Sequence, residues 1–338
     1  RLKELEKTNT NYAQLVEEFI RNDLTGFKRL YLKDREIKNL ILMGDFLTET
    51  IFREERQDNI ITRAEFEKRY ENTVYKTETS LSEEMDIDPE YAALIVPTMV
   101  ICKDFMDLFN AEALWMPGVS LLDGIAYDFG EKKNFIKSAH NFENDILVAA
   151  RNIAKRYSTG KDHIKGTTDL ALAIFDSMKK VHGMGDRERL LLQIAVQLHD
   201  CGKYISMGDV AECSYQIIMA TEIIGLSTEE RQIIANAVRY NTTEFVYYSE
   251  IAGEVGMDRS VYLLIAKLTA ILRIANAMDR SHYQKVKNMK AMLKDRTLLL
   301  TVDSEQDISL ELGLLMDKVE FFEEVFGIRL VFRRKRKV

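Results

Sequence analysis

The sequence predicts a mixed fold, in which an α/β segment is followed by an all-helical domain and then by a small α/β module. The prolines all lie in the first third of the chain or just past it, at Pro89, Pro97 and Pro117. The proline-free run that follows carries apolar residues at 3.6-residue spacing, which indicates packed helices. We expect the three parts to span 1–130, 131–285 and 286–338.

The composition is that of a folded, mildly acidic protein. Of the 338 residues, 46% are apolar and 30% are charged, which is enough to bury a full core. The formal net charge of −7 excludes a protein dominated by nucleic-acid binding, so any polyanion must be held by a local basic patch. The three cysteines lack metal-finger spacing and suit a reducing compartment, which favours a cytoplasmic protein.

We expect neither a membrane span nor a complete protein. The longest apolar stretch, Ala92 to Cys102, is interrupted by Pro97 and is far shorter than the ~20 residues of a membrane helix. The chain opens on Arg1 without an initiator methionine or a signal-like apolar segment, so it reads as a piece of a longer protein.

In the first segment, short apolar runs alternate with signals for helix starts. Thr62 with Glu65 forms a capping box, and Asp88 precedes Pro89 at a first helical position. The polar run 130–133 is the expected linker to the next domain. Strands are predicted at 39–43 and 113–116, and further helices from about Thr48 and over 121–127.

The remainder is predicted as helices and then a small α/β module. Ser227 is an expected N-cap, and the two glycines of 182–185 can take the left-handed conformation that ends a helix. The basic run 333–337 is expected to be a disordered tail. The expected helices are 135–157, 167–181, 186–200, 213–224, 228–240 and 259–278. The module follows as strand 297–302, helix 308–326 with its stop at Gly327, and strand 328–332.

The sharpest chemical feature is His199-Asp200, which lies at the end of an apolar helix and is followed by Gly202-Lys203. Adjacent residues at a helix end can turn towards one point, and imidazole with carboxylate suits a divalent transition metal or a magnesium-like ion. Such a site needs a second histidine, for which His163 is placed, and a later carboxylate from 272–279. The alternative is a helix end in which His199 caps a carbonyl and Asp200 pairs with Lys203 or Arg239.

These residues, in this order, resemble the HD-domain phosphohydrolase pattern. The resemblance is narrower still: it is to the C-terminal helical domain of the exopolyphosphatase/guanosine pentaphosphate phosphohydrolase (Ppx/GppA) family. The residues that carry it are the stretches 183–190, 225–227, 239–240 and 273–282. Upstream, Gly44 and Ser120 to Gly124 resemble the second half of that family's second actin-like domain. The resemblance implies a partial actin-like (ribonuclease H-like) α/β segment, then an HD-like all-helical domain and a small α/β C-terminal module.

The chain departs from the family pattern at two places. The late position, an aspartate in HD hydrolases, is Asn276, and Asp279 one turn on can substitute for it. The family's histidine-rich stretch reads without histidine at 209–214, so we expect no dinuclear site. The HD-like metal set is therefore His163, His199, Asp200, Asn276 and Asp279, while His140, His182 and His282 read as structural or exposed. The turn on the nucleotide side is expected at Gly44 and Asp45.

The resemblance implies a parent enzyme that uses Mg²⁺ to release terminal phosphate from inorganic polyphosphate or pppGpp. Its catalytic half would lie upstream, so we expect this chain alone to be inactive and to contribute polyanion binding and homodimerisation. Two alternatives are an active HD-type metal-dependent nucleotide phosphohydrolase and a noncatalytic module that binds polyphosphate or a guanosine alarmone. The expected polyanion-binding residues are Lys133, Lys137, Arg151, Lys155, Arg156, Lys165, Lys203 and Arg239.

Overall fold

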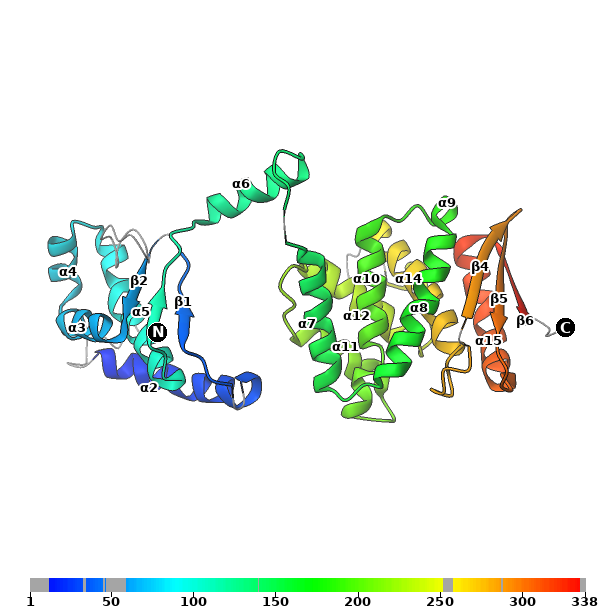
Figure 1. The fold of residues 1–338 in the computed structure, drawn as a ribbon, viewed down its shortest axis with the longest axis horizontal. Helices are drawn as coiled ribbons and strands as arrows, with labels where there is room; N and C mark the ends of the chain where they lie inside the picture. Colours follow the sequence, from blue (N-terminus) through cyan, green and yellow to red (C-terminus); the bar gives the residue numbers. More distant parts are fainter. Residues whose placement is uncertain are drawn as a thin grey trace. The chain divides into compact units, whose positions relative to one another are not determined.

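The fold is mixed and mostly helical, with two small three-stranded sheets (Figure 1). It was obtained as a computed structural model, which describes residues 12–32, 35–44, 46, 59–138, 140–251, 258–286 and 288–334. The chain divides into two compact units, Arg1–Ser138 and Ala139–Val338, called unit 1 and unit 2 below.

Unit 1 is a small sheet accompanied by helices. Strand β3 (Ala113–Trp115) pairs in parallel with β1 (Asn39–Ile41) and antiparallel with β2 (Ile60–Thr62). The helical elements are α2 (Tyr12–Phe27), the π-helical turn η1 (Lys28–Leu32), α3 (Arg63–Thr73), α4 (Glu78–Met85), α5 (Pro89–Phe109) and α6 (Leu121–Lys132).

The predicted helix caps of unit 1 are confirmed. The Thr62 hydroxyl accepts from the Glu65 backbone, and the Glu65 carboxylate accepts from the Thr62 backbone, which closes the capping box of α3. Asp88 caps α5 by accepting from the Glu90 N–H at 2.8 Å, and Pro89 is the first helical residue. Helix α5 runs through Pro97 and supplies much of the core of this unit.

The expected linker is wrong in its position. Residues 130–132 form the last turn of α6, which continues to Lys132, and the division between the units follows Ser138. The helix expected from about Thr48 and the residue Asp45 lie outside the described residues. The actin-like assignment of this unit stays a prediction.

Unit 2 is a group of helices with a sheet at its C-terminal end. Strand β5 (Thr297–Asp303) is central, antiparallel to β4 (Asn288–Lys294) and parallel to β6 (Arg329–Arg334). The helices are α7 (Phe142–Arg156), α8 (Lys161–Ser177), α9 (Lys179–His182), α10 (Asp186–Leu198), the 3₁₀ turn η3 (Cys201–Tyr204), α11 (Val210–Ala220), α12 (Thr228–Arg239), α13 (Tyr248–Ile251), α14 (Arg259–Ala277) and α15 (Ser309–Phe326).

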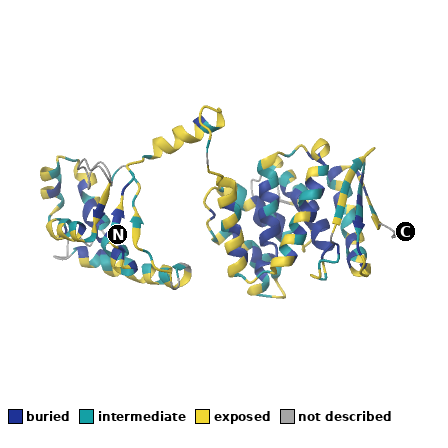
Figure 2. Cartoon of the chain, viewed as in Figure 1, coloured by how far each residue is buried: buried dark blue, intermediate teal, exposed yellow. Residues whose placement is uncertain are grey.

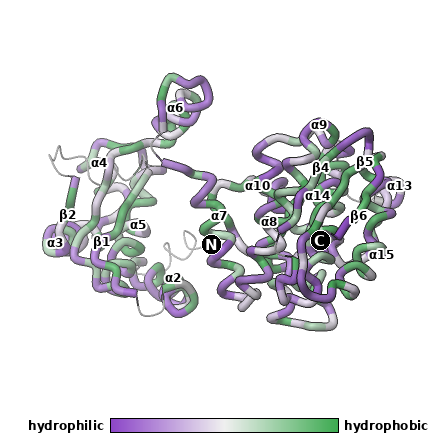
Figure 3. The backbone as a smooth tube through the Cα atoms, turned by 45° about the vertical axis from the view of Figure 1, so that its right-hand side comes forward, coloured by the Kyte–Doolittle hydropathy of each residue, from purple (hydrophilic) through white to green (hydrophobic). Residues whose placement is uncertain are grey.

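The core of unit 2 is built around α10 and α14. Every residue of α14 from Leu268 to Ala277 is buried, and α10 is buried from Leu190 onwards apart from Gln193 (Figure 2). By length and composition α14 passes as a membrane-crossing helix, but 67% of its apolar window is buried within the unit, as in the core helix of a folded domain. The surrounding helices alternate between hydrophilic and hydrophobic residues (Figure 3), which is the pattern of elements with one face in the core.

Most predicted helices of unit 2 are present with shifted ends. Ser227 forms a capping box with Glu230, and Gly183 and Gly327 take the left-handed conformation. Gly185, also expected to be left-handed, has a φ of −104°. Helix α8 begins six residues before the predicted Thr167, at Lys161. Strand β4 was not predicted, although Met289, Ala291 and Leu293 alternate with more exposed residues and pack against the core.

Candidate metal centre

The candidate site lies in unit 2, where His163, His199 and Asp200 converge. His163 is in the first turn of α8, and the early start of that helix is what buries its ring. His199 is the C-cap of α10, with φ −60° and ψ −24°, and Asp200 follows with φ −106° and ψ 2°. The chain thus leaves α-helical geometry at this pair, which lets two adjacent side chains face the same point.

Glycine at position 202 is required by the turn that follows. A Cβ atom at Gly202 would lie 2.3 Å from the Val210 carbonyl oxygen and 2.6 Å from the Ser214 nitrogen. The Gly202 N–H donates to Ser214 Oγ at 2.9 Å. The turn η3 is therefore packed closely on the start of α11, which fixes the direction in which Asp200 points.

The donor atoms of the three residues lie at distances that suit one metal ion. His163 Nε2 is 3.2 Å from His199 Nε2, and His199 Nε2 is 3.5 Å from Asp200 Oδ1. His163 Nε2 is 3.9 Å from Asp200 Oδ2. Two ligand atoms on a tetrahedral ion with bonds of about 2.1 Å are about 3.4 Å apart. The residues present therefore fit a divalent cation.

Hydrogen bonds set the tautomers of both histidines. His199 Nδ1 lies 2.7 Å from the Val196 carbonyl oxygen, and His163 Nδ1 lies 2.7 Å from Asp279 Oδ2. Since a carbonyl oxygen and a carboxylate can only accept, Nδ1 of each ring donates, and a neutral ring of this tautomer has its lone pair on Nε2. The two Nε2 atoms lie at hydrogen-bond distance, and a cation bound beside them would take a lone pair from each.

Charge at the site favours neutral imidazole beside ionised carboxylate. Burial lowers the pKa of His199, so its ring is uncharged at neutral pH. Burial by itself raises the pKa of Asp200, but the nearby His199 and the Lys203 ammonium bring it below its usual value. Lys203 Nζ lies 2.5 Å from Asp200 Oδ2, which is the ion pair expected for a site without metal.

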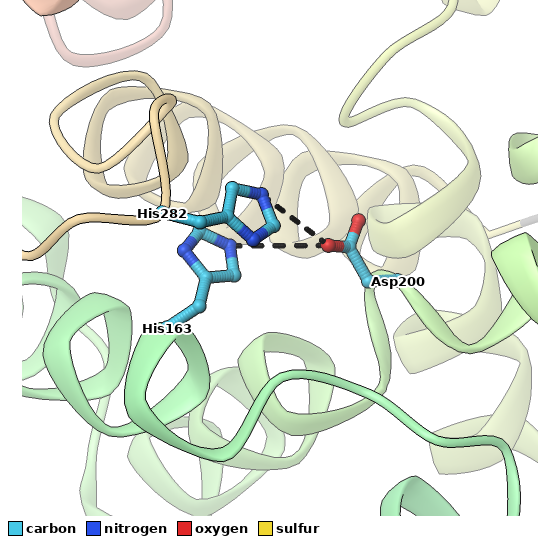
Figure 4. Close-up of side chains that lie close together, drawn as sticks. All are labelled: His163, Asp200 and His282. Carbon is cyan, nitrogen blue, oxygen red and sulfur yellow. Dashed lines mark ion pairs between the residues drawn. The ribbon is translucent and has the colours of Figure 1, made fainter.

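His282 also belongs to the site, although the sequence indicated a structural or exposed residue. Its ring stacks on that of His163, with centroids 3.7 Å apart and planes at 10°. Both rings point towards Asp200, and His282 Nε2 is 3.9 Å from Asp200 Oδ2 (Figure 4). The donor atoms of His163, Asp200 and His282 all lie within 4.8 Å of one another. In the sequence, His282 stands three residues after Asp279 and ends the stretch 273–282 of the family resemblance.

The two late residues of the predicted metal set take other places. The Asp279 carboxylate contacts Nδ1 of His163, the nitrogen that faces away from His199, so it orients this ring. Burial by itself raises the pKa of Asp279, but hydrogen bonds from His163 and Gln284 bring this pKa below its usual value. Asn276 is buried in α14, and within the described part of the chain no hydrogen bond joins its side chain to the histidines.

The predicted polyanion-binding residues do not share one environment. Lys133 and Lys137 belong to unit 1, and the other six belong to unit 2. Lys203 contacts Asp200, and Arg239 pairs with Glu212 at 3.1 Å. Gly44 has a φ of 143° in unit 1, whereas its expected partner Asp45 lies outside the described residues. The four predicted polyanion-binding residues on α7 and α8 are all exposed: Arg151, Lys155, Arg156 and Lys165.

Comparison with known proteins gives one finding. Residues 148–320, which are 173 of the 338 residues, match the family model described as Ppx/GppA phosphatase, domain III. This range contains all four residues of the site. A search of the curated proteins found no significant match.

Proposed function

Because the chain belongs to the Ppx/GppA phosphatase family, we propose that unit 2 is a metal-dependent phosphohydrolase centre for the terminal phosphate of a phosphoanhydride. The substrate class is inorganic polyphosphate or a guanosine phosphate. The observation that carries the proposal is the pair of Nε2 atoms, on His163 and His199, that lie 3.2 Å apart beside Asp200.

The donor set favours a transition metal over magnesium. Imidazole nitrogens suit Mn²⁺, Fe²⁺, Co²⁺ and Zn²⁺, whereas Mg²⁺ prefers carboxylate oxygens and water. His163, His199 and Asp200 would hold the ion. A divalent cation bound there would polarise phosphoryl oxygens and lower the pKa of a bound water. The Mg²⁺ expected from the family resemblance remains a proposal for the parent enzyme.

The neighbouring residues prepare the site for an anionic substrate. Asp279 and the Val196 carbonyl accept from Nδ1 of the two rings, which orients the Nε2 atoms towards the ion that they would hold. The Lys203 side chain is 29% exposed, and its ammonium pairs with Asp200. A cation held by Asp200 would free the Lys203 ammonium to pair with phosphate oxygens.

A second function is favoured by one observation. Lys203 already balances the charge of Asp200, so the site is electrostatically complete without a metal ion. Exposed basic residues on α7 and α8, such as Lys155 and Lys165, would then hold a polyphosphate chain by charge alone. In that case the chain binds the polyanion without turnover, as the sequence first suggested.

Metal content and phosphate release, measured on the same samples, test the proposal. Wild type is compared with His199→Ala and with the control His140→Ala, which changes an exposed histidine outside the site. We expect about one Mn²⁺ or Zn²⁺ per chain and release of phosphate from polyphosphate or a guanosine phosphate, both lost in His199→Ala only. Tight, salt-dependent polyphosphate binding without metal or turnover would instead identify the binding module.

A further inference from the structure

His282 is carried by a short loop of residues 279–285 with an uncommon backbone conformation. His282 has a φ of 58° and Gln284 a φ of 46°. Residues with a Cβ atom rarely adopt such left-handed values, and clusters of them are found where surrounding contacts hold a functional site. The loop therefore needs anchors to keep His282 stacked on His163 (Figure 4).

The first anchor is Asp279 at the start of the loop. Its Oδ1 accepts from the Gln284 backbone N–H at 2.8 Å, and its Oδ2 accepts from Gln284 Nε2 at 3.1 Å. Gln284 Nε2 also donates to the His282 carbonyl at 2.8 Å. Since Oδ2 contacts His163 Nδ1 as well, one carboxylate orients the His163 ring and the backbone around His282.

The second anchor comes from α15, about thirty residues further along the chain. Glu311 is 2% exposed, and its two oxygens bind the residues on either side of His282. Ser281 Oγ donates to one oxygen, and Lys285 Nζ lies 3.3 Å from the other. Burial by itself raises the pKa of Glu311, but these bonds and its own backbone N–H bring it below its usual value. A buried, ionised carboxylate is therefore used to hold this loop.

We propose that Glu311 is a positioning residue, which holds the loop 279–285 so that His282 can bind the same metal ion as His163 and Asp200. This inference rests on the proposed function, because the metal is the same one. Helix α15 belongs to the C-terminal module predicted over 286–338. Through Glu311, this helix would support the metal centre.

Cobalt binding gives a readout that is independent of activity. The visible spectrum of Co²⁺ reports the number and kind of its ligands, and titration calorimetry gives the affinity of the full chain for Co²⁺. We compare wild type with Glu311→Gln, His282→Ala and the double variant, and use Asp317→Asn, an exposed carboxylate of the same helix, as control. We expect Glu311→Gln to weaken Co²⁺ binding about tenfold, in the range known for groups that orient a ligand.

The combination of variants separates positioning from general destabilisation. If Glu311 acts through His282, the double variant binds Co²⁺ no more weakly than His282→Ala alone. Both single variants then shift the Co²⁺ spectrum in the same direction. In the metal-free protein, Glu311→Gln also accelerates hydrogen exchange of the Gln284 N–H, which Asp317→Asn leaves unchanged.

The outcomes distinguish this inference from the function on which it rests. Suppose that wild type binds Co²⁺ and that Glu311→Gln matches Asp317→Asn in Co²⁺ affinity, Co²⁺ spectrum and hydrogen exchange. This result overturns the role of Glu311 and leaves the metal centre intact. Absence of Co²⁺ binding in wild type overturns both. If Glu311→Gln does not fold, Ser281→Ala replaces it, since it removes one of the two loop contacts and leaves the carboxylate paired with Lys285.

Discussion

His163 and His199 meet through their Nε2 atoms at 3.2 Å, and the opposite nitrogen of each ring is held by an acceptor that cannot donate. The two Nε2 atoms are at hydrogen-bond distance, and in their neutral forms with Nδ1 protonated both rings can bind one cation through Nε2. Asp200 supplies the negative charge beside them. The predictions below follow from this arrangement.

Replacing Asp279 by asparagine should weaken metal binding without removing a ligand. The amide of asparagine can donate to Nδ1, which favours the wrong tautomer of His163, and we expect affinity for Zn²⁺ or Co²⁺ to fall by about 10–100-fold. Titration calorimetry measures this, with Asp169→Asn, an exposed carboxylate of α8, as the control. Equal affinities for the two variants would show that the contact with His163 does not orient the ligand.

Lys203→Met should change metal and polyanion binding in opposite directions. Lys203 competes with a metal for Asp200, so its removal should raise the affinity for divalent cation several-fold, while polyphosphate binding weakens. Fluorescence titrations with Mn²⁺ and with polyphosphate measure both, and Lys294→Met, which changes an exposed lysine of β4, is the control. A fall in both affinities would mean that Lys203 supports the site and does not compete for Asp200.

The stability of the metal-free protein should fall as the pH drops below 6.5. Burial lowers the pKa of His199 from the value of 6.5, so below that pH the unfolded chain takes up a proton more readily than the folded one. The loss of stability begins at about pH 6.5, and it is complete below the lowered pKa that His199 has in the folded state. Urea unfolding in EDTA between pH 7.5 and 5 measures it. His199→Gln should flatten this dependence, and an unchanged slope would argue against a buried neutral His199.

Gly202→Ala should destabilise the protein and misplace Asp200. The new Cβ atom would lie 2.3 Å from the Val210 carbonyl oxygen and 2.6 Å from the Ser214 nitrogen, and both atoms belong to the backbone. We expect a loss of about 2 kcal/mol or more in the free energy of unfolding, measured in urea. Gly208→Ala is the control, because the nearest atom to its Cβ is 3.9 Å away. Similar stabilities for both variants would contradict the close packing of η3 on α11.

The part of the site that could be predicted from the sequence is the part determined by local geometry. His199 and Asp200 are adjacent at a helix end, and His163 stands in the order that an HD-like pattern requires. The start of α8 was missed because its N-cap is Gly160, which has no side chain to signal a cap. Asp279 was expected to bind the metal, but the backbone turns its carboxylate to the far side of the His163 ring.

The supporting residues could not be predicted, because only the tertiary fold brings them together. His282 is a single histidine in a loop, with no periodic pattern around it, and its stacking on His163 depends on a left-handed backbone. Glu311 reads as an ordinary first-turn glutamate of a helix, and nothing local indicates that it is buried against Ser281. Strand β4 was missed although Met289, Ala291 and Leu293 alternate along it, because the alternation is weakened by the exposed Met292.

X-ray diffraction from crystals grown with Zn²⁺ or Mn²⁺, collected at the absorption edge of the metal, tests the central claim most directly. We predict one anomalous peak in unit 2, in contact with Nε2 of His163, Nε2 of His199 and the carboxylate of Asp200, with Lys203 displaced. Crystals that show no peak there and retain the Lys203–Asp200 ion pair, at metal concentrations that saturate a known zinc or manganese protein, would contradict it.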